Sequence, residues 1–219
     1  MHRELILTFH GIGDPPDAIT GSERGVWIPI DWFEAIVDAL PRQDVGLSFD
    51  DGNRSDVERA LPILVQRGLT ARFFPLTGRI GAAGYLSAED IAALSAAGME
   101  IGSHGCHHRD WRTLEDRELH EELTTSRQAL AGIVGSAITE IACPFGSYDR
   151  RVLRALRATG YRRVFTSDGG PGSVSSWLSP RTTVAQTLPL QHWLALAGAG
   201  ADQRTSPLLR GKRLVKRLR

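Results

Sequence analysis

Residues 45–67 read VGLSFDDGNRSDVERALPILVQR, an apolar run followed by an amphipathic one. Residues 45–49 have the length and apolar content of a strand that is buried on both faces of a sheet. Residues 55–67 have the apolar spacing of a helix, and Gly68 gives that helix a C-terminal stop. The segment therefore predicts a strand, a turn that contains two acids, and a helix.

The same alternation recurs along the chain. Six further apolar runs are expected to form strands: residues 5–9, 71–76, 99–102, 138–142, 161–165 and 182–185. The amphipathic stretches are expected to form helices: residues 31–40, 87–97, 116–134 and 149–159. This order predicts an α/β fold with a parallel sheet of about seven strands and helices outside it. The periodicity leaves open whether the sheet is an open, doubly wound one or a closed barrel.

Composition excludes several classes of protein. The 219 residues, 42% of them apolar, can bury a continuous core, which excludes a disordered chain. A net charge of +1 gives no general field for nucleic acid, so we expect no nucleic-acid partner. Two cysteines, Cys106 and Cys143, cannot form a disulfide scaffold or a cysteine-only zinc site.

The two ends of the chain give further expectations. No apolar run approaches the roughly 18 residues that span a bilayer, so no transmembrane segment is expected. The first residues are too short and too acidic for a secretory signal, and a cytoplasmic location is expected. Residues 1–205 are expected to form a single domain, followed by a basic tail at 206–219. This tail is either the solvated end of a helix or a segment that touches an anionic surface.

Two adjacent acids, Asp50 and Asp51, follow the strand predicted at 45–49, and Gly52 lets the backbone turn sharply. Like charges so close together raise one pKa unless a cation neutralises them. A metal on one carboxylate, with the other free to act as a base, resolves the conflict. The alternative is an ordinary N-cap for the helix that follows.

Three histidines lie within residues 104–108, at the end of another predicted strand. On a helical turn, His104 and His108 would face one side and could hold one metal, whereas His107 would point elsewhere. Cys106 between them is expected to be a small buried residue. One carboxylate and two histidines leave positions open for water and substrate, as in a catalytic metal site. Zinc is the first choice, and iron, cobalt or nickel also accept this donor set.

A third segment, residues 142–149, reads ACPFGSYD and follows the strand predicted at 138–142. Pro144 and Gly146 on either side of Phe145 indicate a rigid loop, whose backbone N–H could face an oxyanion. The alternative is a simple turn before a helix.

Together the three segments resemble the polysaccharide deacetylases of the NodB homology domain, carbohydrate esterase family 4. Residues 48–52 match the first motif of that family, residues 104–108 the second and residues 144–146 the end of the third. The resemblance covers about residues 5 to 185. It implies a deformed (β/α) barrel, related to the TIM barrel, and metal-dependent hydrolysis of N-acetyl groups on a sugar, oligosaccharide or polysaccharide.

The resemblance also implies roles for individual residues. Asp50 corresponds to the catalytic base, and Asp51, His104 and His108 correspond to the metal ligands. The backbone N–H of Phe145 corresponds to the oxyanion donor.

One departure from the family concerns the general acid. The C-terminal Leu-x-His motif that supplies it has no good match after residue 185, and His192 lies in a predicted amphipathic helix. Some members of the family are circularly permuted, with the last strand at the N-terminus. We therefore predict that His10, at the end of the strand predicted at 5–9, is the acid. The alternative is that His10 caps this strand or bonds the loop at 11–13.

A second departure concerns the arginine that usually opens the third motif, where this chain has Ala142. Arg181 is the predicted substitute that orients Asp50, the alternative being a surface salt bridge. The alternatives to a carbohydrate deacetylase are an amide or cyclic-imide hydrolase on the same barrel, and a catalytically weakened sugar-binding protein. The expected partner is an N-acetylated saccharide, whose identity and length the sequence leaves open.

Overall fold

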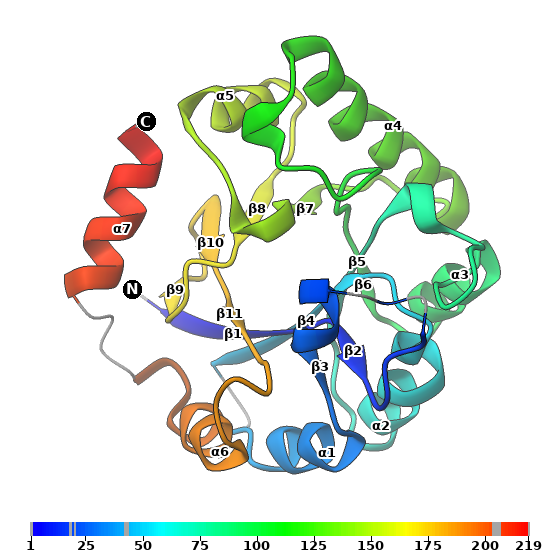
Figure 1. Cartoon of the computed structure of the whole chain (residues 1–219), viewed down its shortest axis with the longest axis vertical. Coiled ribbons are helices and arrows are strands. Elements are labelled where there is room, and N and C mark those ends of the chain that lie inside the picture. Colours follow the sequence, from blue (N-terminus) through cyan, green and yellow to red (C-terminus); the bar gives the residue numbers. More distant parts are fainter. Residues whose placement is uncertain (1, 18, 20, 42–43, 203–206, 219) are drawn as a thin grey trace.

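The computed structural model describes residues 2–17, 19, 21–41, 44–202 and 207–218. The strands gather in the middle of the molecule and the helices are arranged around them (Figure 1). The fold is therefore of the mixed α/β class that the alternation in the sequence predicts.

Five parallel strands form the main sheet, in the order β11-β1-β4-β5-β6. In that order they span Thr182–Thr183, Arg3–Phe9, Val45–Asp51, Arg72–Pro75 and Glu100–Ile101. The short strand β9 (Gly172–Ser173) pairs antiparallel with the start of β1. The strand predicted from residues 5–9 thus lies directly beside the one that ends in the two acids.

Three further parallel strands form a second sheet, in the order β10-β8-β7. They span Leu178–Pro180, Arg163–Thr166 and Glu140–Ala142. A parallel bridge between Ser103 and Ile141 connects the end of β6 to β7. At the other edge, Arg181 separates β10 from β11, so residues 178–183 pass from the second sheet directly into the main sheet.

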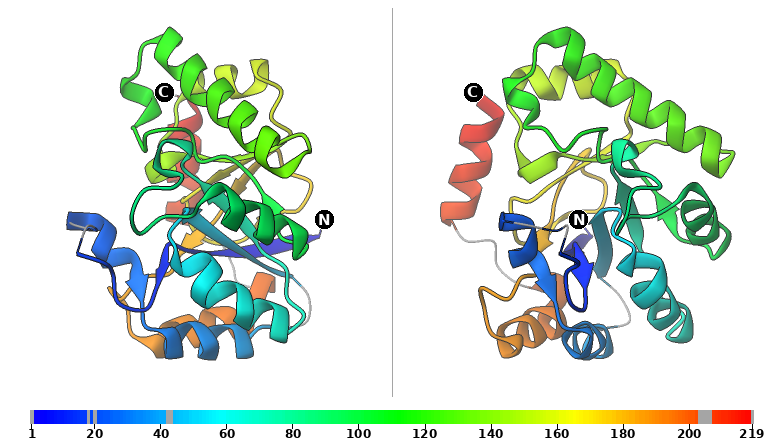
Figure 2. Two further views of the ribbon diagram at one scale, coloured as in Figure 1. Left: turned by 90° about the vertical axis from the view of Figure 1, so that its right-hand side faces the viewer. Right: turned by 45° about the vertical axis from the view of Figure 1, so that its right-hand side comes forward.

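All seven strands predicted from the sequence are present, but they do not form one continuous ladder. Sequence reasoning missed β9 and β10, and it missed β2 (Gly11–Ile12) and β3 (Trp27–Ile28), which pair with each other. These elements are only two or three residues long, too short to produce a periodic signal. The described residues between 11 and 28 project beyond the carboxyl end of β1 (Figure 2).

The helices lie where the amphipathic stretches predict them. They are α1 (Ile30–Asp38), α2 (Leu61–Gln66), α3 (Ala88–Ala96), α4 (Asp116–Val134) and α5 (Arg150–Ala158), followed by α6 (Leu190–Ala199) and α7 (Pro207–Leu218). The helix predicted at 55–67 is divided into a π-helical turn, η2 (Asp56–Ala60), and α2. Pro62, at the start of α2, has no amide hydrogen to donate to the preceding turn, and the wider turn accommodates it.

Alternation along the strands separates the core from the site. Phe9, Phe49 and Phe73 are register partners on β1, β4 and β5, and their rings stack at centroid distances of 5.4 and 4.7 Å. Phe33 of α1 covers this row, 5.1 Å from Phe9. Because successive side chains point to opposite faces of a strand, Asp50 points away from this row, toward the space between the two sheets.

Two further expectations concern membranes and cysteines. Within the described ranges, no helix is both long and apolar enough to cross a membrane. Both cysteines are buried and free, so no disulfide joins Cys106 to Cys143.

Candidate metal centre and active site

One pocket collects most of the residues that the sequence singles out. It opens at the carboxyl ends of β1 and β4, and it is lined by His10, Glu23, Val26, Asp50, Asp51, His104, His108, Phe145, Ser167 and Thr183. The main-sheet strands are parallel, and their following loops therefore meet at one edge of the sheet.

Asp50 is buried and held by Arg181. The guanidinium donates from Nη1 to Oδ1 of Asp50 at 2.7 Å and from Nη2 to Oδ2 at 2.6 Å. Burial by itself would raise the pKa of Asp50, but Arg181 and His104 outweigh it and hold that pKa well below its ordinary value. Asp50 is therefore ionised at neutral pH.

Arg181 is itself fully buried, with 0% of its surface exposed. The alternative of a surface salt bridge is therefore wrong. Its Nη1 also donates to Ser48 Oγ at 3.2 Å, and its guanidinium lies 5.2 Å from the centre of the Phe74 ring. These contacts fix the plane of the guanidinium, and with it the plane of the Asp50 carboxylate.

Asp51 faces the two histidines on the other side of the turn. Its Oδ1 lies 3.6 Å from His104 Nε2 and 3.5 Å from His108 Nε2, and the three possible ligand atoms lie within 4.8 Å of one another. Among the residues that the structure describes, Oδ1 is buried and has no hydrogen-bond partner. Neither Asp50 nor Asp51 acts as an N-cap, because both belong to β4 and the following turn begins at Ser55.

The protonation states of Asp51 and His104 are compatible with binding of a cation. Burial raises the pKa of Asp51 to about 6 and lowers the pKa of His104 to about 3, so the imidazole is neutral. His104 Nδ1 lies 2.9 Å from the carbonyl oxygen of Ala142, which leaves Nε2 free to face Asp51. A buried carboxylate oxygen without a partner, beside two imidazole nitrogens, fits a divalent metal of the zinc type.

The two histidines converge through a loop, and the expectation that they share a helical turn is wrong. Residues 104–108 have no helical structure, and His108 has a positive φ of 52°. Gly105 between them has a φ of 84°, a conformation that favours glycine. The backbone reverses at Gly105 and His108 and brings both rings to one side. Their proximity therefore comes from the loop and not from four-residue spacing on a helix.

Glu122 of α4 holds this loop in place. Its buried Oε2 accepts hydrogen bonds from the backbone N–H of Cys106 at 2.6 Å and of His107 at 3.3 Å. Cys106 is buried, as predicted, and His107 is exposed and lies outside the pocket. Sequence reasoning did not find Glu122, because nothing in α4 distinguishes it from the neighbouring acids.

Glu23 is a second residue that sequence reasoning missed. It lies in η1 (Gly21–Val26), and its Oε1 is 3.4 Å from His108 Nδ1 and 2.8 Å from Arg79 Nη2. Partial burial opposes ionisation of Glu23, but Arg79 outweighs it and lowers the pKa. Residues 13–26 carry no motif, so only the fold brings this carboxylate to the far side of the His108 ring.

Phe145 lies in η5 (Pro144–Gly146) with φ 57° and ψ 9°. A left-handed conformation costs a residue other than glycine about 1–3 kcal/mol, and it persists only where the surroundings impose it. Here the loop is held by the bond from Cys143 N to Phe165 O, and the Phe145 ring lies 4.3 Å from the His108 ring. Phe145 lines the edge of the pocket in this conformation.

His10 follows β1 and lines the same pocket. The register of Phe9 with Phe49 places it level with the two acids. Its Nδ1 is buried without a hydrogen-bond partner among the described residues, so the ring does not use this atom to bond residues 11–13. His192 is exposed on α6 and does not line the pocket.

Comparison with known families agrees with this geometry. Residues 38–164, more than half of the chain, match the family model described as polysaccharide deacetylase. This chain belongs to the polysaccharide deacetylase family. The resemblance noted from the three sequence motifs is thereby confirmed.

Two relatives in this family illustrate the extent of similarity. A chitin deacetylase of Pestalotiopsis sp is 31% identical over 118 residues, which cover 54% of this chain and 39% of the relative. A chitooligosaccharide deacetylase of a Bradyrhizobium strain is 29% identical over 132 residues, covering 59% of this chain and 58% of the relative. The chain therefore spans about half the length of the curated relatives that it matches.

Solved structures share the polysaccharide deacetylase fold. The Streptococcus pyogenes deacetylase PplD, solved in complex with acetate, superposes with a TM-score of 0.77 at 19% identity, covering 88% of this chain and 97% of PplD. At this identity the match concerns the fold alone.

Proposed function

We propose that this member of the family is a metal-dependent hydrolase that removes N-acetyl groups from a saccharide. The observation that carries the proposal is the contrast between two adjacent carboxylates. Asp50 is ionised and bound to Arg181, whereas Asp51 faces two imidazoles with an Oδ1 that has no hydrogen-bond partner in the described part of the chain. Amide hydrolysis needs both a general base that stays ionised and a separate group that polarises the carbonyl.

Asp51, His104 and His108 would hold the metal, with zinc favoured by the donor set and iron, cobalt or nickel compatible with it. When bound, the metal would act as a Lewis acid on the acetyl carbonyl and lower the pKa of water. Glu23, beside His108 Nδ1, would orient that ligand and increase its basicity.

Asp50 is proposed as the general base that accepts a proton from the attacking water. Both of its oxygens accept from Arg181, yet each carboxylate oxygen has a second lone pair. Arg181 is then a positioning residue, because it fixes the direction of those lone pairs. It takes the place of the arginine that the family has where this chain has Ala142.

The backbone N–H of Phe145 is proposed to donate to the carbonyl oxygen as negative charge develops on it. His10 is proposed as the acid for the leaving group. The water oxygen bonds to the acetyl carbon, the carbon–nitrogen bond breaks, Asp50 accepts the water proton, and His10 gives a proton to the amine. Acetate and a free amino sugar are the products.

The barrel is part of the same proposal. We infer that the two sheets form one deformed (β/α) barrel, because residues 178–183 pair with β8 at one end and with β1 at the other. The bridge between Ser103 and Ile141 supports closure at the opposite edge. Residues 1–205 would form the catalytic unit.

The reading as a weakened sugar-binding protein rested on Ala142 and on the missing C-terminal motif. Arg181 binds Asp50 in place of the arginine that Ala142 replaces, and His10 lines the pocket, where it could supply the acid of the missing motif. We therefore favour an active enzyme. The names of the relatives support N-acetylglucosamine oligomers as the substrates to test.

The test is acetate release from N-acetylglucosamine oligomers by the zinc-loaded protein. Asp50→Asn is expected to lower kcat by about 10²–10⁴-fold while leaving the fold intact, because the amide cannot accept the proton. Equal inactivity of both proteins on every N-acetylated saccharide would overturn the proposal. Turnover of a cyclic imide without acetate release would favour the alternative hydrolase.

A further inference from the structure

Helix α7 carries an unusual concentration of exposed apolar side chains. Nine large apolar residues are exposed among the residues that the structure describes, and four of them lie on this helix of 12 residues. They are Leu208 (68% exposed), Leu214 (57%), Val215 (50%) and Leu218 (63%). Such a concentration on the outside of a helix calls for a partner.

These four residues form one stripe. Leu214 and Leu218 are four residues apart, and Leu208 and Val215 are seven apart, so each pair lies along one side of the helix. At 3.6 residues per turn the two sides adjoin and make an apolar face about 120° wide. We name this face, Leu208, Leu214, Val215 and Leu218, the apolar stripe.

The opposite side of α7 faces the protein, where Leu209 lies close to Gly169 and two basic side chains make polar contacts. Lys216 Nζ donates to the carbonyl oxygen of Gly146 at 3.1 Å and to Asp168 Oδ1 at 2.5 Å. Arg213 donates to the carbonyl oxygens of Gly169 and Gly170. A helix on a globular protein ordinarily places its large apolar side chains on the core and its polar face in water, whereas α7 places one leucine inward and four large apolar side chains outward.

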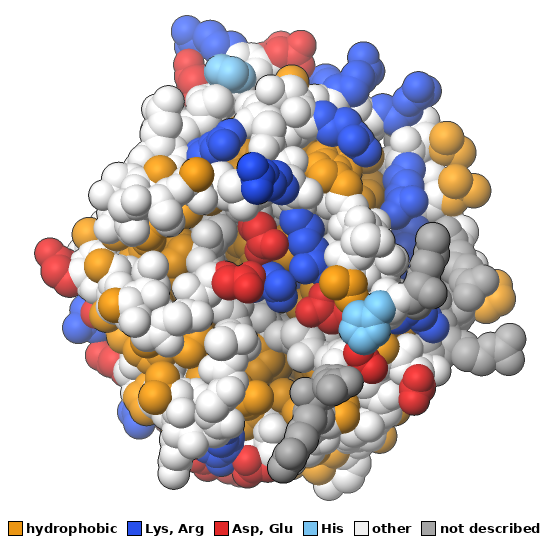
Figure 3. Space-filling model, turned by 180° about the vertical axis from the view of Figure 1, so that it is seen from behind, with side chains coloured by type: hydrophobic (Ala, Val, Ile, Leu, Met, Phe, Trp, Pro, Cys, Tyr) orange, Lys and Arg blue, Asp and Glu red, His pale blue; other side chains and the backbone are white. Residues whose placement is uncertain are grey.

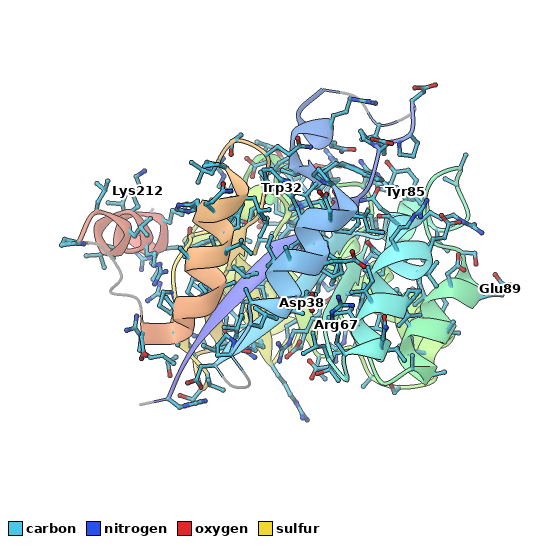
Figure 4. All side chains as sticks on the ribbon, turned by 90° about the horizontal axis from the view of Figure 1, so that it is seen from below. Trp32, Asp38, Arg67, Tyr85, Glu89 and Lys212 are labelled. Carbon is cyan, nitrogen blue, oxygen red and sulfur yellow. The ribbon has the colours of Figure 1, made fainter. Side chains whose placement is uncertain are left out.

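Basic side chains border the apolar stripe. Lys212 is exposed next to Leu208 on the helical projection, and Arg217 is exposed next to Leu214. Residues 203–219 contain no acidic residue. α7 lies at one side of the molecule with Lys212 projecting from it (Figure 4), and the edge that α7 occupies combines apolar and basic side chains in the view from behind (Figure 3).

We propose that α7 docks on the surface of a bilayer that contains anionic phospholipid. The apolar stripe would enter the region between headgroups and acyl chains, while the bordering cations would contact lipid phosphates. A helix with its apolar side outward, basic borders and polar anchors to its own protein fits this arrangement. The helix lies in the interface and does not span it.

A second copy of the chain is a poorer occupant. Two apolar stripes in contact would bring the basic borders of both copies together, and their repulsion would oppose the pairing. A stable protein interface also needs roughly 20–30 residues on each side, whereas the apolar stripe offers four side chains.

The test is co-sedimentation with vesicles of two compositions: phosphatidylcholine alone, and an equimolar mixture of phosphatidylcholine and phosphatidylglycerol. The full chain is expected to bind the mixed vesicles at least about tenfold more tightly, and added salt should weaken the binding. The double variant Leu214→Ser/Leu218→Ser should lose at least about tenfold of the affinity, because two large apolar groups no longer enter the interface.

A matched pair of single variants separates the stripe from exposed apolar surface in general. Val215→Ser should weaken binding, whereas Val65→Ser, at a similarly exposed valine (55%) on α2, should not. Lys212→Glu gives a second readout, a selective loss of binding to the mixed vesicles. Circular dichroism checks that each variant is folded.

Three results would overturn the proposal. The first is equal binding of the full chain to both vesicle types. The second is binding by the double variant that is as tight as that of the parent. The third is a parent protein that binds no vesicles but forms a dimer, with the double variant monomeric. Acetate release from soluble oligomers is expected to be the same for the parent and the double variant. The outcome is thus independent of the proposed activity.

Discussion

At the scale of single residues, the pairing of Asp50 with Arg181 shows which parts of a site can be predicted from sequence and which cannot. Two adjacent acids after a buried strand pointed to a base beside a metal, and that expectation needed only local chemistry. Arg181 lies 131 residues further along the chain. Its choice as the partner was a hypothesis until the fold placed it against Asp50, because sequence spacing carries no information on such a contact.

Arg181→Lys tests orientation apart from charge. Lysine keeps the positive charge but cannot donate two parallel hydrogen bonds to Asp50, so the carboxylate loses its fixed plane. We expect kcat for N-acetylated oligomers to fall about 10–100-fold with little change in KM. Arg163→Lys, in an ion pair with Glu4 outside the pocket, is the control and should retain full activity. An unchanged kcat in Arg181→Lys would contradict the positioning role.

His10→Gln tests the proposed acid through its dependence on the leaving group. A sugar amine must be protonated to leave, whereas 4-nitrophenolate leaves without a proton. The variant should therefore lose about 10²–10⁴-fold in kcat on N-acetylated oligomers and far less on 4-nitrophenyl acetate. Equal losses on both substrates would assign His10 to some other task.

At the scale of elements, the loop at 104–108 shows where periodicity misleads. The sequence predicted that His104 and His108 lie side by side on a helical turn; the structure brings them together, but through a loop. The two rings come together because the backbone reverses direction at Gly105, and Glu122 of α4 stabilises this loop by accepting a hydrogen bond from the backbone N–H of Cys106. The presence of the longer strands and helices was predictable from apolar spacing, whereas the backbone of an irregular loop depends on contacts that only the folded chain makes.

Gly105→Ala tests that loop. The new Cβ would lie 2.7 Å from Glu122 Oε2, in a backbone conformation that alanine disfavours. We expect zinc affinity, measured by competition with a chelating dye, to fall at least about tenfold, because disturbing the groups that hold metal ligands in place costs about that much. Gly81→Ala, at a φ of 79° with open space around it, is the control and should leave zinc affinity unchanged. Equal effects would mean that backbone strain alone is responsible.

The π-helical turn that begins at Asp56 offers a pH test. This side chain is buried, neither oxygen has a hydrogen-bond partner among the described residues, and burial raises the pKa of Asp56 well above 3.8. Above that ordinary value the unfolded carboxyl ionises while the folded one stays protonated, so rising pH destabilises the wild type.

Asp56→Asn removes this titration. The variant should gain stability relative to the wild type as pH rises from about 4, up to the raised pKa of the folded state. Urea unfolding at several pH values measures the difference. A difference that is constant with pH would show that the pKa of Asp56 is the same in the folded and unfolded states, and would contradict the prediction.

At the scale of the whole molecule, the metal site and the hydrophobic core are separate. The candidate ligands lie at or beyond the carboxyl ends of the strands, whereas the stacked phenylalanines lie further back in the sheet, on the face of β4 opposite to Asp50. The α/β class followed from the alternation of strands and helices. The division of the strands into two sheets could not be predicted in this way, because it depends on strands of two or three residues.

Metal removal should therefore leave the protein folded. Zinc at about 100 times its Kd is expected to add about 2.7 kcal/mol to the free energy of unfolding and to raise Tm accordingly. His104→Ala should remain folded but lose this zinc-dependent rise in Tm. Unfolding of the variant, or of the chelated wild type, would instead indicate a structural site.

The passage of residues 178–183 from one sheet to the other has a consequence for folding kinetics. Arg181 reaches Asp50 only when a late segment of the chain has joined strands formed by its first fifty residues, a contact of very high sequence separation. Such contacts carry a large loop-closure cost and form slowly. During refolding, secondary structure should therefore return first, and catalytic competence should lag behind it until this last strand is in place.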